Sequence, residues 1–245
     1  MKGYNGQIIL SCEHGGNQIP SNYQKLFKRQ VNLLNSHYAY DKGALVVARR
    51  LSKRLKAPLI YSITSRLLID LNRSLHHPGL FSDFSRSAND IIKSEIIKHH
   101  YSPYHSRIGK LIDESIQHNK RAFHFSIHSF TPELNGEVRN ADFGILYNPS
   151  RNIEKKIAKS LQLFIKENSG FSVRLNYPYL GKADGLTTIL RKKYPVSRYC
   201  GIEIEMNQSA FDNPRNKTNE FVYILTKGIG EVLGVRSIIP RRIFT

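Results

Sequence analysis

The chain has 245 residues, of which 40% are hydrophobic, so it can bury a sizeable core and is not globally disordered. Its longest apolar runs, such as residues 44–48, fall far short of the roughly 20 residues that span a membrane. No apolar signal-peptide core follows Lys2, and two cysteines do not make a disulfide framework. We therefore expect one domain over residues 1–245, with no membrane span, in the reducing cytoplasm.

The charge balance is strongly basic, with 37 Lys and Arg residues against 19 Asp and Glu residues and a formal net charge of +18. Such an excess can indicate a nucleic-acid or anionic-surface partner. The basic residues are spread along the chain, however, and most fall on the polar faces of predicted helices. A solvated basic surface that attracts anionic substrates is therefore favoured, and nucleic-acid binding is the alternative.

Hydrophobic spacing predicts alternating strands and helices in the first half of the chain. Strands are expected at residues 4–11, 58–62 and 67–71, and a helix is expected at residues 41–55. Residues 13–20 are typical of a loop, in which Pro20 opens a short helix. Residues 90–118 are expected to form one or two helices, with a break near Ser102 and Pro103.

The second half continues this alternation. Strands are expected at residues 122–129, 141–147 and 199–206, and helices at residues 153–168, 184–193 and 217–233. Strands that alternate with helices indicate an α/β fold with a mixed, largely parallel sheet flanked by helices. In such sheets, functional sites gather at the C-terminal ends of the strands.

Residue types that bind ions or transfer protons lie at or just after four of the predicted strand ends. They are Glu13 and His14, Asn72 and Arg73, His128, and Glu205. Two histidines and an oxygen ligand can hold a zinc ion with one position open for water. An arginine can bind a substrate carboxylate through two hydrogen bonds, and a glutamate can deprotonate the attacking water. The set describes a metal-dependent amide hydrolase.

Each metal-binding candidate also has a structural interpretation. His14 precedes two glycines, which let a backbone approach a ligand, but a loop histidine that is hydrogen-bonded to its own turn is equally compatible. His128 shares a strand face with His124, and for His124 a half-buried structural role is favoured. Asp41 begins a predicted helix, where an aspartate ordinarily acts as a cap.

Two glutamates near the C-terminal end of the sequence indicate a functional site more strongly than these candidates do. Glu203 and Glu205 share one face of a strand, and burying two carboxylates is costly unless they are paired or employed. One of them is therefore expected to be functional, and spacing alone does not say which. A Gly-x-Ser-x-Gly elbow, a phosphate-binding glycine loop and a paired Cys-x-x-Cys are all absent from the sequence, so other common chemistries fit poorly.

Arginines near the strand ends supply candidate binding groups for an anionic substrate. Asp70 is expected to fix the turn that presents Asn72 and Arg73. Arg66 and Arg139 are further candidate anion-binding residues, although many arginines of this chain are expected at its surface.

Taken in chain order, the motifs resemble the N-formylglutamate amidohydrolase family. The most specific match is residues 65–73 (SRLLIDLNR). The other matching segments are residues 12–20 (CEHGGNQIP), 37–44 (HYAYDKGA), 104–105 (YH), 126–132 (SIHSFTP), 176–181 (NYPYLG) and 205–208 (EMNQ). Their order and spacing follow those of the family over most of the chain.

The resemblance implies a zinc-carboxypeptidase-like fold, because the family is related in architecture to the zinc carboxypeptidases and aspartoacylases. It also implies that His14 and His128 are zinc ligands. In those relatives a glutamate ligand lies three positions after the first histidine, where this chain has Asn17. The resemblance suggests Asp41 as the replacement, with Glu13 as the alternative.

The same resemblance implies that Asn72 and Arg73 bind a substrate carboxylate and that Glu205 is the general base and acid. The expected activity is zinc-dependent hydrolysis of the amide bond of a small N-acyl amino acid such as N-formyl-glutamate. Two alternatives stay open. One is a metal amidase that acts on peptides, and the other is a basic nucleic-acid-binding protein on an enzyme-like scaffold.

Overall fold

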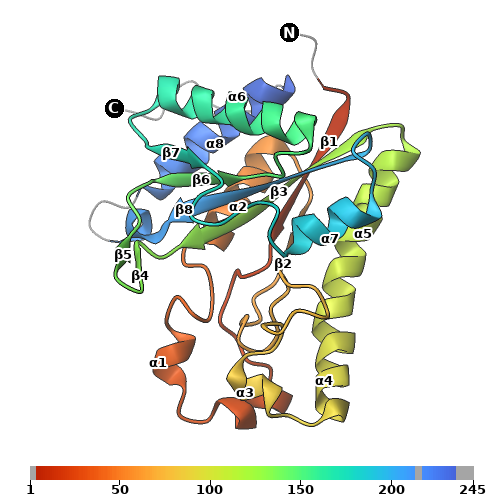
Figure 1. Cartoon of the computed structure of the whole chain (residues 1–245), viewed down its shortest axis with the longest axis vertical. Coiled ribbons are helices and arrows are strands. Elements are labelled where there is room, and N and C mark those ends of the chain that lie inside the picture. The colour runs from red at the N-terminus through yellow and green to blue at the C-terminus, as the bar shows by residue number, and fades with distance from the viewer. Residues whose placement is uncertain (1–3, 213–216, 236–245) are drawn as a thin grey trace.

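A six-stranded sheet forms the centre of the computed structural model, which describes residues 4–212 and 217–235 (Figure 1). In spatial order its strands are β2 (Leu59–Tyr61), β1 (Gly6–Cys12), β3 (Arg121–Phe130), β8 (Tyr199–Asn207), β6 (Phe143–Leu146) and β7 (Val173–Leu175). The first four run parallel, β6 is antiparallel to β8, and β7 is parallel to β6. The predicted mixed, largely parallel sheet is confirmed.

Helices flank this sheet, and the described residues also include a short hairpin and several turns. The longer helices are α2 (Ala44–Leu55), α5 (Ser102–Gln117), α6 (Asn152–Asn168), α7 (Leu186–Lys193) and α8 (Thr218–Leu233). The shorter elements are η1 (Ser21–Phe27), α1 (Val31–Leu34), α3 (Asp83–Arg86), α4 (Asp90–Ile96), η2 (Ile97–Tyr101), β4 (Glu133–Leu134), β5 (Glu137–Val138) and η3 (Gln208–Phe211). Within the described residues, no helix has the length and apolar character that crossing a membrane requires.

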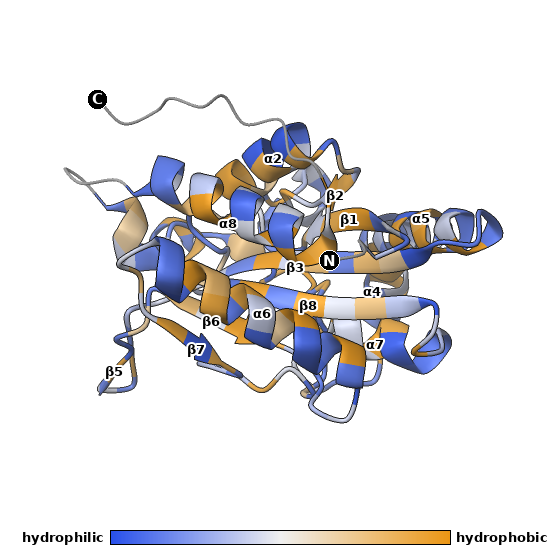
Figure 2. Ribbon diagram, turned by 90° about the horizontal axis from the view of Figure 1, so that it is seen from above, coloured by the Kyte–Doolittle hydropathy of each residue, from blue (hydrophilic) through white to orange (hydrophobic). Residues whose placement is uncertain are grey.

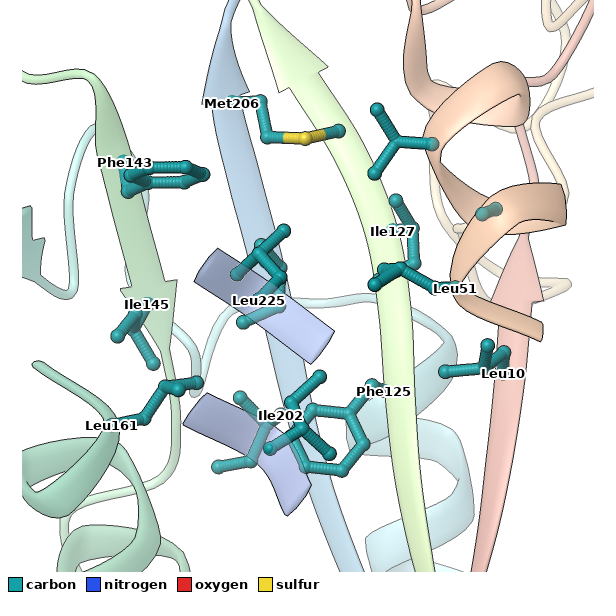
Figure 3. Close-up of a cluster of buried hydrophobic side chains, with 14 of the residues drawn as sticks. Leu10, Leu51, Phe125, Ile127, Phe143, Ile145, Leu161, Ile202, Met206 and Leu225 are labelled. Carbon is teal, nitrogen blue, oxygen red and sulfur yellow. The ribbon is translucent and has the colours of Figure 1, made fainter. Parts of the chain in front are cut away.

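One face of the sheet carries the larger hydrophobic cluster, against helices α2, α6 and α8. Phe125 and Ile127 of β3 meet Leu51 of α2 and Leu225 of α8 there, and Leu161 of α6 belongs to the same cluster (Figure 3). Each such leucine contributes about 1.5–3 kcal/mol by leaving water. Hydrophobic and hydrophilic stretches alternate along α6, as expected for a helix that covers a core with one side only (Figure 2).

The opposite face of the same strands is polar although it is also buried. Side chains of a strand alternate between faces, so the polar positions of β1, β3 and β8 gather on one side. These residues are Ser11, His124, Ser126, His128, Glu203 and Glu205. The sheet register places His128 directly beside Glu205. Helices α5 and α7 and the segment between β2 and α3 cover this face through a second hydrophobic cluster.

Three local expectations need correction. Residues 67–71 do not form a strand, because turns fold this segment back: Asp70 N–H binds the Leu80 carbonyl at 2.8 Å, and the apolar side chains pack in the second cluster. Helix α2 begins at Ala44 rather than at Asp41, because Gly43 turns the chain with φ 81°. Pro103 does not break the helical region, since it lies in the first turn of α5 and a π-helical segment precedes it.

Candidate active site

Two histidines and one aspartate meet at the C-terminal end of β1 and β3. His14 follows β1, His128 lies near the end of β3, and Asp41 comes from the segment that leads into α2. All three are buried, and one ligand atom from each lies within 4.8 Å of the others. Asp41 Oδ2 is 2.8 Å from His128 Nδ1 and 3.5 Å from His14 Nδ1. The predicted metal-binding residues are therefore brought together by three separate segments.

The outer nitrogen of each histidine faces a buried carboxylate. His14 Nε2 lies 2.7 Å from Asp70 Oδ1, and His128 Nε2 lies 2.9 Å from Glu13 Oε2. A carboxylate can only accept, so each Nε2–H donates outward, and His128 Nδ1 likewise donates a hydrogen in its contact with Asp41. Metal-binding histidines characteristically donate their second ring N–H to such a partner.

The charges and free ligand atoms of this group fit a divalent cation. His14 Nδ1 is buried and has no hydrogen-bond partner among the described residues. Burial would raise the pKa of the Asp41 carboxyl, but His14 and His128 outweigh it and hold this pKa well below its usual range. Asp41 is thus ionised beside the two histidines, and a metal bound through their Nδ1 atoms would replace the imidazole protons as the partner of this buried charge.

Glu13 lies on the outer side of the His128 ring and not among the three convergent ligand atoms. Its Oε1 accepts a hydrogen bond from the Tyr104 hydroxyl at 2.7 Å, and its Oε2 accepts one from Ser126. Burial opposes ionisation of Glu13, but hydrogen bonding from His128 holds the pKa of this carboxyl well below its usual range. Glu13 and Asp41, the two alternatives for the third ligand, therefore occupy different positions.

Glu205 and Glu203 are both buried on β8, yet they have different surroundings. Glu205 Oε2 is buried without a hydrogen-bond partner among the described residues. Burial raises the pKa of Glu205 to about 7; the charge of His128 opposes this shift, and that of Asp41 adds to it. The Glu203 carboxylate instead accepts a hydrogen bond from the Thr187 hydroxyl of α7. Glu205 is the carboxylate that retains an unused oxygen beside the histidines.

The Asn72–Arg73 pair lies in the turn that Asp70 shapes, as expected. Asp70 Oδ1 accepts the backbone N–H of Asn72 at 2.9 Å in addition to its contact with His14. Asn72 Oδ1 accepts the N–H of Leu186 at the start of α7, and Arg73 Nη1 donates to the Asp184 carbonyl at 3.0 Å. These contacts anchor the turn to α7. The amide nitrogen of Asn72 makes no hydrogen bond within the described residues.

Two further arginines, Arg66 and Arg139, lie near the site: Arg66 pairs with Asp70, and Arg139 contacts Tyr179. Arg66 Nη2 donates to Asp70 Oδ2 at 2.7 Å, and its Nη1 lies 3.6 Å from Asp41 Oδ1. The ring of Tyr179 lies 5.2 Å from the Arg139 guanidinium carbon, and its hydroxyl accepts from Arg139 Nη1 at 3.2 Å. Arg139 is 6% exposed, and its Nε has no partner in the described part of the chain.

The loop that carries Tyr179 packs close to Glu205. Gly144 of β6 lies opposite Glu205 in the sheet. A side chain at Gly144 would collide with the backbone carbonyl of Tyr177, so this glycine allows the loop to approach. Asn207, two residues after Glu205, donates its amide to the Arg139 carbonyl at 2.9 Å. Arg139 and Tyr179 are thus held beside the end of β8.

Sequence reasoning assigned no role to Tyr104, Ser126 or Tyr179. Ser126 could have been found from the strand period, because it shares a face with His128. Tyr104 and Tyr179 occur in the quoted motifs, but their partners are distant in the chain. His124 contacts the Tyr199 hydroxyl at 2.8 Å and Ser11 at 2.7 Å, and burial lowers its pKa to about 4, as suits a structural histidine.

Comparison with solved structures agrees with this fold. A gene product, Atu2144, from Agrobacterium tumefaciens has a solved structure that matches with a TM-score of 0.80 and 28% identity, over 94% of this chain and 92% of that chain. N-formylglutamate amidohydrolase from Ralstonia eutropha JMP134 matches with a TM-score of 0.67 and 18% identity, over 95% and 96%, and at that identity it supports the fold alone. A search of curated proteins found no match.

The family comparison is the more specific one. The family description of N-formylglutamate amidohydrolase matches residues 6–211, which is well over half of the chain. This range contains every residue of the buried group and the flanking arginines. The match supports an enzyme that hydrolyses amides. By its motifs, its fold and this match, the chain belongs to the N-formylglutamate amidohydrolase family.

Proposed function

We propose that this chain is a single-domain, zinc-dependent hydrolase of the amide bond of a small N-acyl amino acid such as N-formyl-glutamate. The observation that carries the proposal is the convergence of His14, Asp41 and His128 beside a buried carboxylate, Glu205, that has an unused oxygen. Two imidazoles and one carboxylate make a donor set that suits zinc, and catalytic zinc sites commonly have three protein ligands.

In this proposal His14 and His128 hold the ion through Nδ1, and Asp41 is the third ligand. Asp41 is favoured over Glu13 because its carboxylate lies between the two inward nitrogens, whereas Glu13 lies behind the His128 ring. A bound zinc ion would act as a Lewis acid on the amide carbonyl and on water. Asp70 would orient His14 from the side away from the ion.

Glu205 is the proposed general base and acid. Its carboxylate would take a proton from the attacking water and deliver that proton to the departing amine nitrogen. A pKa raised to about 7 by burial suits both steps near neutral pH, because the group can accept and release a proton with little cost. The pairing of Glu203 with Thr187 makes Glu203 a structural carboxylate in this scheme.

Four polar side chains are proposed to bind the anionic substrate. Asn72 and Arg73 would bind one carboxylate from the turn at Asp70, with Arg66 beside them. Arg139 would bind a further anionic group. A buried guanidinium with an unpartnered Nε is costly in the free protein, and a substrate carboxylate would remove that cost.

Arg139→Met is expected to weaken substrate binding while leaving the metal in place. Loss of a hydrogen bond to a charged group costs about 1.5–3 kcal/mol, or roughly 10- to 150-fold in kcat/KM, with most of the change in KM. Steady-state kinetics on N-formyl-glutamate would measure it. Arg174→Met is a matched control, because Arg174 stacks on Tyr177 of the same loop at 3.9 Å and is exposed. Equal KM values in the two variants would contradict the role of Arg139.

The proposed function is tested by metal analysis and a hydrolysis assay on the same purified protein. We expect stoichiometric zinc, release of formate from N-formyl-glutamate, loss of activity with a chelator, and recovery when zinc is restored. A metal-free protein that cannot be reconstituted would refute the proposal.

Short N-acylated peptides belong in the same assay, because cleavage of peptides alone would favour the peptide amidase. A mobility-shift titration at low salt would test the nucleic-acid alternative.

A further inference from the structure

The Glu13 carboxylate has no exposed surface and accepts hydrogen bonds from several buried donors. Its Oε1 accepts from the Tyr104 hydroxyl of α5 at 2.7 Å, and its Oε2 accepts from the Ser126 hydroxyl of β3. A further donor is His128 Nε2, at 2.9 Å from Oε2. Helix α5 and strand β3 therefore hold this carboxylate from two sides, against the outer edge of the His128 ring.

His128 is the ion-pair partner of the Glu13 carboxylate, whose charge also acts on His105 and His124. Within residues 4–212 and 217–235, its one ion pair is with His128. Asp70, the corresponding partner of His14, also pairs with Arg66 at 2.7 Å. The ring of His128 thus lies between the Glu13 carboxylate and Asp41, with a different nitrogen facing each. A buried charge with one such partner is expected to govern the orientation and basicity of that partner.

We propose that Glu13 is a positioning residue of the metal centre rather than a metal ligand. It keeps the Nε2–H of His128 outward, so that the Nδ1 lone pair faces the ion. The hydroxyls of Tyr104 and Ser126 hold the carboxylate in the orientation that this requires. Tyr104 and Ser126 thereby acquire a role that extends the site from β3 to α5. The inference rests on the proposed function for the presence of a metal.

Ser126 supports this geometry from a second direction. Its hydroxyl lies 2.8 Å from His128 Nε2 and also contacts Glu13. A hydroxyl has one hydrogen, so if it donates to the carboxylate its lone pairs face the imidazole N–H. The His128 N–H then lies between two acceptors, and a ring flip would place the Cε1–H group against them. The network therefore selects one ring orientation and keeps a hydrogen on Nε2.

Glu13→Gln tests the inference without relying on catalysis. The amide keeps the size and one acceptor of the side chain but removes its charge. We expect zinc affinity, measured by competition with a chromophoric chelator, to fall about 10- to 100-fold. We also expect the visible spectrum of the cobalt-loaded protein to change, because the spectrum reports ligand geometry. Tyr104→Phe should shift both readouts in the same direction by a smaller factor.

Tyr199→Phe is the matched control, because it also removes a buried tyrosine hydroxyl that contacts a histidine, here His124. It should leave zinc affinity and the cobalt spectrum unchanged. If Glu13 were merely structural, Glu13→Gln would alter thermal unfolding of the metal-free protein and leave both metal readouts as in the wild type, which would overturn the inference. If Glu13→Gln fails to fold, Tyr104→Phe decides in the same way.

The outcome also separates this inference from the proposed function. A wild-type protein that binds zinc but hydrolyses no N-acyl amino acid refutes the proposed substrate and leaves the role of Glu13 measurable. A wild-type protein that binds neither zinc nor cobalt overturns both. A Glu13→Gln variant with unchanged affinity in an active, zinc-containing enzyme overturns the inference alone.

Discussion

Glu205→Gln is expected to reduce kcat on N-formyl-glutamate by about two to four orders of magnitude, the range typical of a lost general base or acid. Glutamine has nearly the same shape and keeps an oxygen, but it cannot take a proton from water near neutral pH. Zinc content and substrate binding should therefore persist. Steady-state kinetics, metal analysis and a binding measurement with a slowly cleaved substrate would together distinguish lost chemistry from lost binding.

The environment of Glu205 explains why the effect should be large. It lies beside His128 in the sheet, and its Oε2 has no partner within the described residues. Burial raises its pKa to about 7, so proton transfer to and from water or an amine is closely matched in energy. An unpartnered buried oxygen contributes little to folding, so its replacement is expected to affect catalysis more than stability.

Glu203→Gln is the matched control for this prediction. Both glutamates lie on one face of β8, both are buried, and the substitution is chemically the same. The Glu203 carboxylate already accepts a hydrogen bond from Thr187, so its change should appear mainly in thermal unfolding. Near-normal turnover of Glu205→Gln with full zinc occupancy would show that Glu205 is not the base. A collapse of kcat in Glu203→Gln alone would assign that role to Glu203.

The central strands were predictable because their signal is local. Strands were expected at residues 122–129 and 199–206, and the structure has Arg121–Phe130 and Tyr199–Asn207. The period of two also predicts that Glu203 and Glu205 share a face. It does not predict which carboxylate is free, because Thr187 reaches Glu203 from a different element, α7. That distinction depends on how a helix packs on the sheet.

The expectations that the structure corrects also failed because contacts between distant residues decide the local structure. An apolar run at 67–71 suggested a strand, but turns shape its backbone. Asp70 N–H donates to the Leu80 carbonyl at 2.8 Å, and Arg66 N–H, just before the run, donates to the Ala39 carbonyl at 3.1 Å. The contact between Tyr104 and Glu13 joins residues 91 positions apart. The period of hydrophobic residues does not predict such pairs. For Asp41, local helix propensity favours a capping role, whereas the family resemblance implied a metal ligand. The structure places its carboxylate between two histidines.

The second large effect is expected from the metal ligands themselves. His14→Ala, His128→Ala and Asp41→Ala should each reduce bound zinc from about one ion per chain to a small fraction, because each removes one of three ligands. Turnover should fall with the metal and should not recover at ordinary zinc concentrations. Metal analysis of purified variants, with circular dichroism to verify folding, would measure this.

His124→Gln is the control for the two histidine variants, since His124 is a buried histidine of the same strand as His128. Its contacts with Ser11 and Tyr199 can be kept by a side chain with one donor and one acceptor, so zinc should stay bound.

The comparison of Asp41→Ala with Glu13→Gln then identifies the third ligand. Asp41 lies 2.8 Å from the inward nitrogen of His128, whereas Glu13 lies 2.9 Å from the outward one. A metal cannot bind both nitrogens of one ring at a single site, so the two carboxylates cannot share the role. Full zinc occupancy in Asp41→Ala, with its loss in Glu13→Gln, would mean that the ring binds through Nε2 and that Glu13 is the ligand.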